Sequence, residues 1–134
     1  MFIKVKTTKT FTDITDKIEI PKDFNGIVNI FSKHTTAGIR ILESEKLLLA
    51  DYQSMLERFA PQTSFYAHNI IEARDVPPEE RINGHSHIRT LFFPTSETIP
   101  VRDGEMIMGK WQRIFLVDLD LSRQREIIVT LCKT

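Results

Sequence analysis

The sequence contains little cysteine and no long apolar run. Its 134 residues include one cysteine, Cys132, so neither a disulfide framework nor a thiolate-rich metal site can form within one chain. No apolar stretch approaches the roughly 20 residues that a membrane-spanning helix needs. The first residues alternate apolar and basic side chains, unlike the apolar block of a signal peptide. We therefore expect a cytoplasmic protein with no membrane partner.

Neither sign of charge is in excess. Lys and Arg together number 18, and so do Asp and Glu, which gives a formal net charge of zero. Proteins dedicated to nucleic-acid binding normally carry a basic excess, so we expect no nucleic-acid partner. The five glycines are scattered, which excludes a glycine-rich phosphate-binding loop. The length predicts a single domain over residues 1–134.

The apolar pattern predicts an α+β fold with a mostly antiparallel sheet, arranged as a sandwich or an open barrel. Expected strands are 2–8, 27–35, 39–43, 99–102, 105–108, 112–119 and 126–131. Asp103-Gly104 is typical of a two-residue hairpin turn. The segment 112–119 is apolar on both faces, as a central strand would be. Because the strands cluster instead of alternating with helices, antiparallel pairing is favoured.

Two main helices are expected between these groups of strands. The first follows Ser44 as its N-cap, and its apolar residues recur at helical spacing until Pro61. The second begins near Pro77 and runs to about Leu91. A short helical turn is also expected at 13–16.

Histidine is the side chain best suited to bind a metal here. The four histidines are His34, His68, His85 and His87. Three imidazoles could hold zinc with one position open to water, although four in 134 residues is also an ordinary number for structural or surface roles. If His85 and His87 lie on a helix, their rings point about 200° apart, so only one of them belongs to the site.

The turn after the second expected strand could also bind or activate a substrate. Thr35 and Thr36 could bind an anion through hydroxyl and backbone N–H groups, or they could simply fix the turn. Glu43 could act as a general base or metal ligand, or it could cap the next helix. A tight hairpin at this turn would place Glu43 opposite Ile30, roughly 13 Å along the strand from His34.

Charged and aromatic side chains near the C-terminus leave further alternatives open. Asp118 and Asp120 share a strand face, where they could hold magnesium beside a diphosphate or only solvate the strand end. Arg123 and Arg125 could bind phosphate or balance these two aspartates. Trp111 is expected to pack in the core or in an interface, because large aromatic side chains mainly supply buried area.

Several short segments occur in an order and spacing that one known family shares. They are Lys33-His34-Thr35-Thr36-Ala37 with Glu43 downstream, Tyr66-Ala67-His68, Asn83-Gly84-His85-Ser86-His87-Ile88, and Gly109-Lys110-Trp111-Gln112. Over nearly its whole length the sequence resembles the YjbQ-like family, which is often labelled secondary thiamine-phosphate synthase. Lys110 stands where the family has threonine, and it could add a phosphate contact.

The resemblance implies a compact α+β homotrimer with a histidine-lined pocket that often holds an ion. By position, His34, His68 and His87 would bind a divalent metal, zinc or else magnesium. His87 and Glu43 would act as catalytic residues, and Thr35 and Thr36 would position a small phosphorylated metabolite. The implied reaction joins a hydroxymethylpyrimidine diphosphate to a thiazole phosphate. The alternative is a non-catalytic trimeric module that binds a metabolite or a metal.

Overall fold

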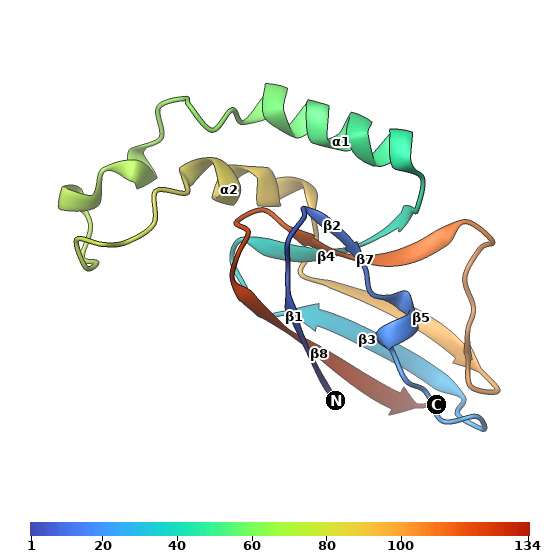
Figure 1. Ribbon diagram of the computed structural model, residues 1–134. Coiled ribbons are helices and arrows are strands. Elements are labelled where there is room, and N and C mark those ends of the chain that lie inside the picture. Colours follow the sequence, from blue (N-terminus) through green and yellow to red (C-terminus); the bar gives the residue numbers. More distant parts are fainter.

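Two antiparallel sheets and two helices make up the fold in the computed structural model, which describes residues 1–134 (Figure 1). The larger sheet has the order β1 (Phe2–Lys6), β8 (Gln124–Lys133), β3 (Gly26–Ser32), β5 (Ser96–Arg102) and β6 (Glu105–Met106). The smaller sheet has the order β2 (Phe11–Asp13), β7 (Gln112–Asp118) and β4 (Ala37–Glu43). All strand pairs are antiparallel, so the predicted α+β class is confirmed.

Strand β7 separates two apolar cores. Ile114 and Leu116 pack into the core shared with β3, β5 and β8 of the larger sheet. Phe115 and Val117 point the opposite way and pack against α1 (Lys46–Phe59). Because neighbouring side chains on a strand point to opposite faces, one apolar strand can serve both cores. The expectation of a central strand here is confirmed.

The first helix begins one residue later than expected. Glu45, not Ser44, is the N-cap, and its carboxylate accepts hydrogen bonds from the backbone N–H groups of Leu47 and Leu48. The longer Glu side chain extends to the N–H groups of the first turn, where an acidic group also suits the helix dipole. No helix of the chain has the length and apolar character needed to cross a membrane.

The second helix is much shorter than the sequence predicts. Helix α2 covers Gly84–Arg89 and continues as the 3₁₀ helix η4 (Thr90–Phe92). The expected start at Pro77 is wrong, because there the chain forms only a turn, which the N–H of Glu80 closes on the carbonyl of Pro77 at 3.1 Å. Three other 3₁₀ helices are η1 (Thr15–Lys17), η2 (Ala67–Asn69) and η3 (Ile71–Ala73), and η1 confirms the expected turn near residues 13–16.

Strands β3 and β4 do not form the considered hairpin. Ile30 pairs with Glu97 and Val129 in the larger sheet, whereas Glu43 pairs with Gln112 in the smaller one. The chain passes from one sheet to the other between the two strands, so their apolar faces pack against each other instead of pairing edge to edge. The expected hairpin at Asp103-Gly104 is confirmed, with both residues at positive φ.

Candidate functional site

A buried ion pair lies where β7 leads into β8. Asp118 is fully buried and Arg125 is 2% exposed. Nε and Nη2 of Arg125 donate to the two carboxylate oxygens of Asp118 at 2.9 and 2.7 Å. Nη2 also lies 2.9 Å from the hydroxyl oxygen of Thr36. Arg125 therefore neutralises Asp118 and ties the β7–β8 turn to the turn before β4.

Asp120 is the second charged centre of this turn. Its carboxylate accepts hydrogen bonds from Arg81 at 2.8 Å and from the side-chain amide of Asn83 at 2.9 Å, and Arg123 lies 3.1 Å away. Partial burial would raise the pKa of Asp120, but the bonds from Asn83 and Arg81 and the charge of Arg123 outweigh it and lower the pKa. Asp120 is therefore ionised and joins the turn to the start of α2.

Helix α2 is fixed against both this turn and η2. The hydroxyl of Ser86 donates to the carbonyl of Leu119, and the N–H of Gly84 donates to the side chain of Asn69 at 2.9 Å. A Cβ atom at Gly84 would lie 2.6 Å from the Cβ of Tyr66, so the close contact requires glycine. These contacts set the direction in which each α2 side chain points.

The functional side chains of α2 lie in two different places. His85 and Arg89 are four residues apart, so they lie on one face, and both line the same cavity. His87 leaves from another side, where its ring centroid is 4.4 Å from that of His68. The expectation that helical geometry separates His85 from His87 is confirmed.

The cavity beside His85 and Arg89 has a volume of about 360 Å³ and is mostly polar. It lies between α1, α2 and the β7–β8 turn. Three of its ten lining residues are apolar. The lining residues are Thr10, Gln53, Gln62, Ile82, His85, Arg89, Asp118, Leu119, Asp120 and Leu121.

Arg89 is the most unusual residue of the cavity wall. Its side chain is 7% exposed, and its Nε donates to the carbonyl of Ala60 at 2.9 Å. Its Nη2 lies 3.3 Å from a carboxylate oxygen of Glu57, yet it makes no hydrogen bond within the protein. A buried guanidinium normally has all its donors bonded. Nη2 of Arg89 is therefore a buried donor without a hydrogen bond, held next to the carboxylate of Glu57.

His85 gives the same cavity a proton acceptor. Partial burial, and then the charge of Arg89, lower the pKa of His85 below its ordinary value. The imidazole is therefore neutral at pH 7 and can accept a proton from a bound molecule. Together, Arg89 and His85 allow the cavity to bind an anion and to move a proton.

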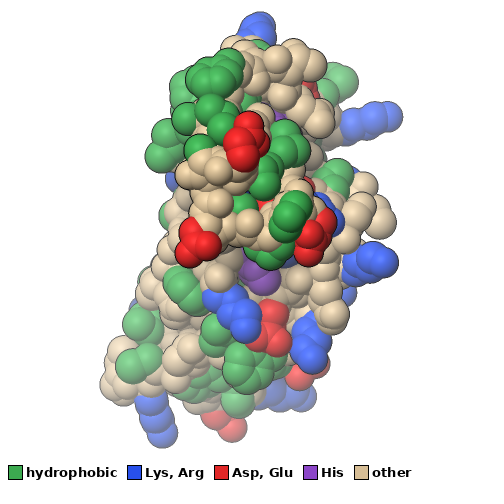
Figure 2. Space-filling model, turned by 90° about the vertical axis from the view of Figure 1, so that its left-hand side faces the viewer, with side chains coloured by type: hydrophobic (Ala, Val, Ile, Leu, Met, Phe, Trp, Pro, Cys, Tyr) green, Lys and Arg blue, Asp and Glu red, His purple; other side chains and the backbone are tan.

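His34 lies apart from the other predicted metal ligands. Its Nε2 accepts the backbone N–H of Glu126 at 2.9 Å, and it lines a small cavity of about 260 Å³ with Lys4, Lys33, Gln124 and Glu126. Figure 2 shows acidic, basic and apolar side chains mixed over one face of the molecule, with histidine surface visible only in recesses between them. Nowhere in the chain do three or more His, Cys, Asp or Glu side chains form a group suited to a metal ion. The three predicted imidazoles therefore do not make a zinc site within one chain.

The other residues singled out from the sequence lie in different surroundings. The hydroxyl of Thr36 is bonded to Arg125, and Thr35 is exposed. Glu43 is exposed at the far end of β4, about 23 Å of strand from Thr36 at 3.3 Å per residue. Trp111 is 65% exposed beside the amino group of Lys110, so it does not pack in the core of this chain.

Arg89 was missed because nothing in a single sequence marks one arginine among many. The available signal was its position, four residues after His85 on the same helix. Asn83 and Gln53 were missed for a different reason. Asn83 binds Asp120 in the β7–β8 turn, and Gln53 lines the cavity from α1. Both roles depend on segments that are distant in sequence.

The comparisons with known proteins agree with one another. The family model "UPF0047 protein YjbQ-like" matches residues 1–134. A UPF0047 protein of Methanothermobacter thermautotrophicus is 42% identical over 79% of this chain and 68% of its own length. One from Archaeoglobus fulgidus is 30% identical over 96% and 98%. The crystal structure of a YbjQ-like protein of unknown function from Sulfolobus solfataricus P2 is 34% identical, covers 96% of this chain and 92% of its own, and has a TM-score of 0.81.

Proposed function

The chain belongs to the YjbQ (UPF0047) family, and we propose that it is an enzyme acting on a small phosphorylated metabolite whose phosphate binds at Arg89. The observation that carries the proposal is the buried guanidinium with one edge unbonded at the wall of a polar cavity. Arginine suits this role because its planar fork matches two phosphate oxygens.

The charges around the cavity support an anionic ligand. Arg81 and Arg123 pair with Asp120, Arg125 pairs with Asp118, and Arg89 approaches Glu57. Four guanidinium groups thus meet three carboxylates. Because Asp118 and Asp120 are paired with other arginines, Glu57 is the carboxylate that an anionic ligand would have to displace from Arg89.

His85 is the group we assign to proton transfer. It lines the cavity with Arg89, and its lowered pKa keeps it a base at neutral pH. This differs from the role expected for His87 and Glu43, which lie away from this cavity. Thr35 and Thr36 have no assigned contact with the phosphate, because neither of them lines the polar cavity.

The specific reaction that we propose is thiamine-phosphate synthesis. It requires a group that neutralises the diphosphate leaving from the pyrimidine, and Arg89 can do so. A divalent metal, zinc or magnesium, would supply further charge neutralisation when bound. The single chain offers His68 and His87 as two adjacent ligands without a third, so no step is assigned to the metal here.

Calorimetric titration with inorganic pyrophosphate tests the phosphate site. Arg89→Met is expected to weaken binding about 10- to 100-fold, because a hydrogen bond to a charged group contributes about 1.5–3 kcal/mol. Glu57→Gln is expected to tighten binding, because it removes the carboxylate that competes for Arg89. Arg40→Met, at an exposed position on β4, is the matched control. Unchanged binding in both Arg89→Met and Glu57→Gln would refute the site.

Turnover tests the enzymatic part of the proposal. Release of pyrophosphate is measured from hydroxymethylpyrimidine diphosphate in the presence of the thiazole phosphate. We expect turnover that is lost in Arg89→Met and retained in Arg40→Met. Because the C–N bond forms at a thiazole nitrogen that carries no proton, His85→Ala is expected to retain turnover of this substrate pair. Pyrophosphate binding without any turnover would support the second candidate instead.

The second candidate is a non-catalytic homotrimer held together by an ion. The contact between His68 and His87 favours it, because two imidazoles at one surface would need a ligand from another chain to complete a zinc site. Large exposed apolar side chains such as Phe65 (81% exposed) and Leu91 (77%) are compatible with an interface. Under this candidate, a chelator dissociates the trimer, and His87→Ala abolishes the bound metal measured by mass spectrometry.

A further inference from the structure

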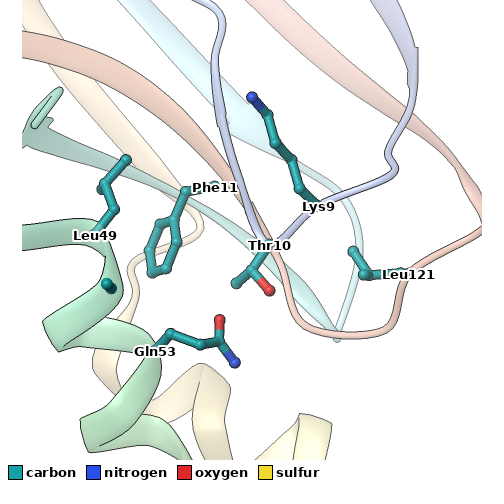
Figure 3. Close-up of a pocket in the computed structure, with 7 residues that line it drawn as sticks. Lys9, Thr10, Phe11, Leu49, Gln53 and Leu121 are labelled. Carbon is teal, nitrogen blue, oxygen red and sulfur yellow. The ribbon is translucent and has the colours of Figure 1, made fainter. Parts of the chain in front are cut away.

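A second cavity lies directly beside the polar one. It has a volume of about 410 Å³, and Phe11, Leu49, Ala50 and Leu121 give it a mainly apolar wall. Figure 3 shows Phe11 and Leu49 on one side of Thr10 and Leu121 on the other, with Gln53 below Phe11. Lys9 completes its lining.

The two cavities share part of their walls. Thr10, Gln53 and Leu121 line both. The two cavities therefore adjoin each other at these three side chains. The two cavities differ in character, with a guanidinium and an imidazole in one and aliphatic and aromatic groups in the other.

The apolar wall is held in place by the core beneath it. The ring of Phe11 is 7% exposed and lies 6.0 Å from the ring of Tyr52 and 6.3 Å from that of Phe93, measured between centroids. Leu49 belongs to the same packed group on α1. An apolar ligand would therefore meet a surface that is already formed, which reduces the entropy lost on binding.

Gln53 lies where the two cavities adjoin, so it can form a hydrogen bond with a ligand that occupies both. Its amide nitrogen donates to Glu57 at 3.3 Å. This bond orients the amide and leaves its carbonyl oxygen to accept a hydrogen bond from the ligand. Thr10 adds a hydroxyl at the same junction.

We propose that the two cavities form one bipartite site, which takes a phosphate monoester or diphosphate whose organic part is an apolar group of about the size of a ring. The inference rests on the proposed phosphate site at Arg89. The organic part contacts Phe11, Leu49 and Ala50, and the phosphate binds Arg89. A sugar phosphate is disfavoured, because its hydroxyl groups would lose water against this wall without gaining partners.

Calorimetry with three probes tests the inference: inorganic phosphate, glycerol phosphate and phenyl phosphate. Phenyl phosphate is expected to bind at least about tenfold more tightly than glycerol phosphate, which carries the same monoester charge. Burial of about 60 Å² of ring surface is enough for this difference at about 25 cal/mol per Å².

Ala50→Phe fills the apolar cavity from an exposed position on α1. It is expected to remove the advantage of phenyl phosphate and to leave inorganic phosphate binding unchanged. Leu47→Phe is the matched control, because Leu47 is 71% exposed on the same helix and lines neither cavity. Thermal unfolding verifies that both variants are folded.

The outcomes separate this inference from the proposed function. Equal binding of phenyl and glycerol phosphates, or an unchanged preference in Ala50→Phe, overturns the bipartite site while the phosphate site stands. A preference for phenyl phosphate that does not depend on Arg89 overturns the link between the cavities. No binding of any phosphate refutes both proposals.

Discussion

Asp118 and Arg125 meet edge to edge in the interior, with both carboxylate oxygens bonded to the guanidinium at 2.7 and 2.9 Å. Arg125 also donates to the backbone carbonyl of Asp120 at 3.0 Å. The pair therefore fixes the turn that carries Asp120 and forms one wall of the polar cavity. Replacing either residue with a neutral one leaves the other buried without a countercharge.

Asp118→Asn is accordingly expected to destabilise the fold by about 3–5 kcal/mol, because removing one member of a buried ion pair strands the other. Urea unfolding measures the change. Lys33→Gln serves as the comparison, since it breaks a solvent-screened pair with Glu126, and such pairs contribute far less than buried ones. Equal losses in the two variants would contradict the assigned role of the buried pair.

Gly84→Ala tests the contact that brings His68 to His87. Alanine in place of glycine inside a helix would normally stabilise by about 0.5–1 kcal/mol. Here the new methyl group would meet Tyr66 and the Asn69 side chain, and overpacking costs about 1–3 kcal/mol. We expect a net loss in thermal stability and altered NMR shifts of both imidazoles. A stabilised variant with unchanged shifts would refute the contact.

The N-cap of α1 gives a prediction that distinguishes two adjacent residues. Glu45→Ala is expected to lower the free energy of unfolding by about 0.5–2 kcal/mol, the usual loss for a removed cap. Ser44→Ala is expected to change it by less than about 0.5 kcal/mol, because Ser44 makes no cap bond. Chemical denaturation of both variants measures the difference. A larger loss in Ser44→Ala than in Glu45→Ala would identify Ser44 as the N-cap instead.

Mild acid should destabilise the protein through its histidines. Partial burial is the largest cause that lowers the pKa of His34, His85 and His87. In the unfolded chain these groups take up protons near pH 6.5, whereas the folded chain resists until lower pH. Their contribution to stability is therefore complete above pH 6.5 and decreases as the pH falls below it. Thermal unfolding between pH 7.5 and 5.5 measures this loss.

His87→Gln is expected to flatten that pH dependence, since glutamine does not titrate. A thermal unfolding midpoint that rises on acidification from pH 7.5 to 5.5 would contradict the lowered pKa values.

The positions of most strands could be predicted because alternation is a local pattern. The double-faced apolar run of β7 predicted a central strand, and Asp103-Gly104 predicted the turn between β5 and β6. The partners of β3 could not be predicted, because alternation fixes which side chains face the core but not which strand lies alongside. Strand β2 has three residues, which is too short for any periodicity.

The candidate site was predicted less well than the fold. Helical geometry correctly separated His85 from His87, yet the sequence favoured His87 over His85 and did not identify Arg89. A buried arginine looks no different in sequence from a solvated one, because its burial depends on Ala60 and Glu57 at the end of another helix. The location of His34 depends on a backbone N–H of β8, which no side-chain pattern encodes.

A crystal soaked with tungstate, a heavy analogue of phosphate, tests the central claim most directly. The account predicts an anomalous peak in the polar cavity with tungstate oxygens about 3 Å from a guanidinium nitrogen of Arg89, and no such peak in crystals of Arg89→Met. Tungstate bound only between Lys4 and Lys33 in the cavity beside His34, or an empty polar cavity at saturating tungstate, would contradict it.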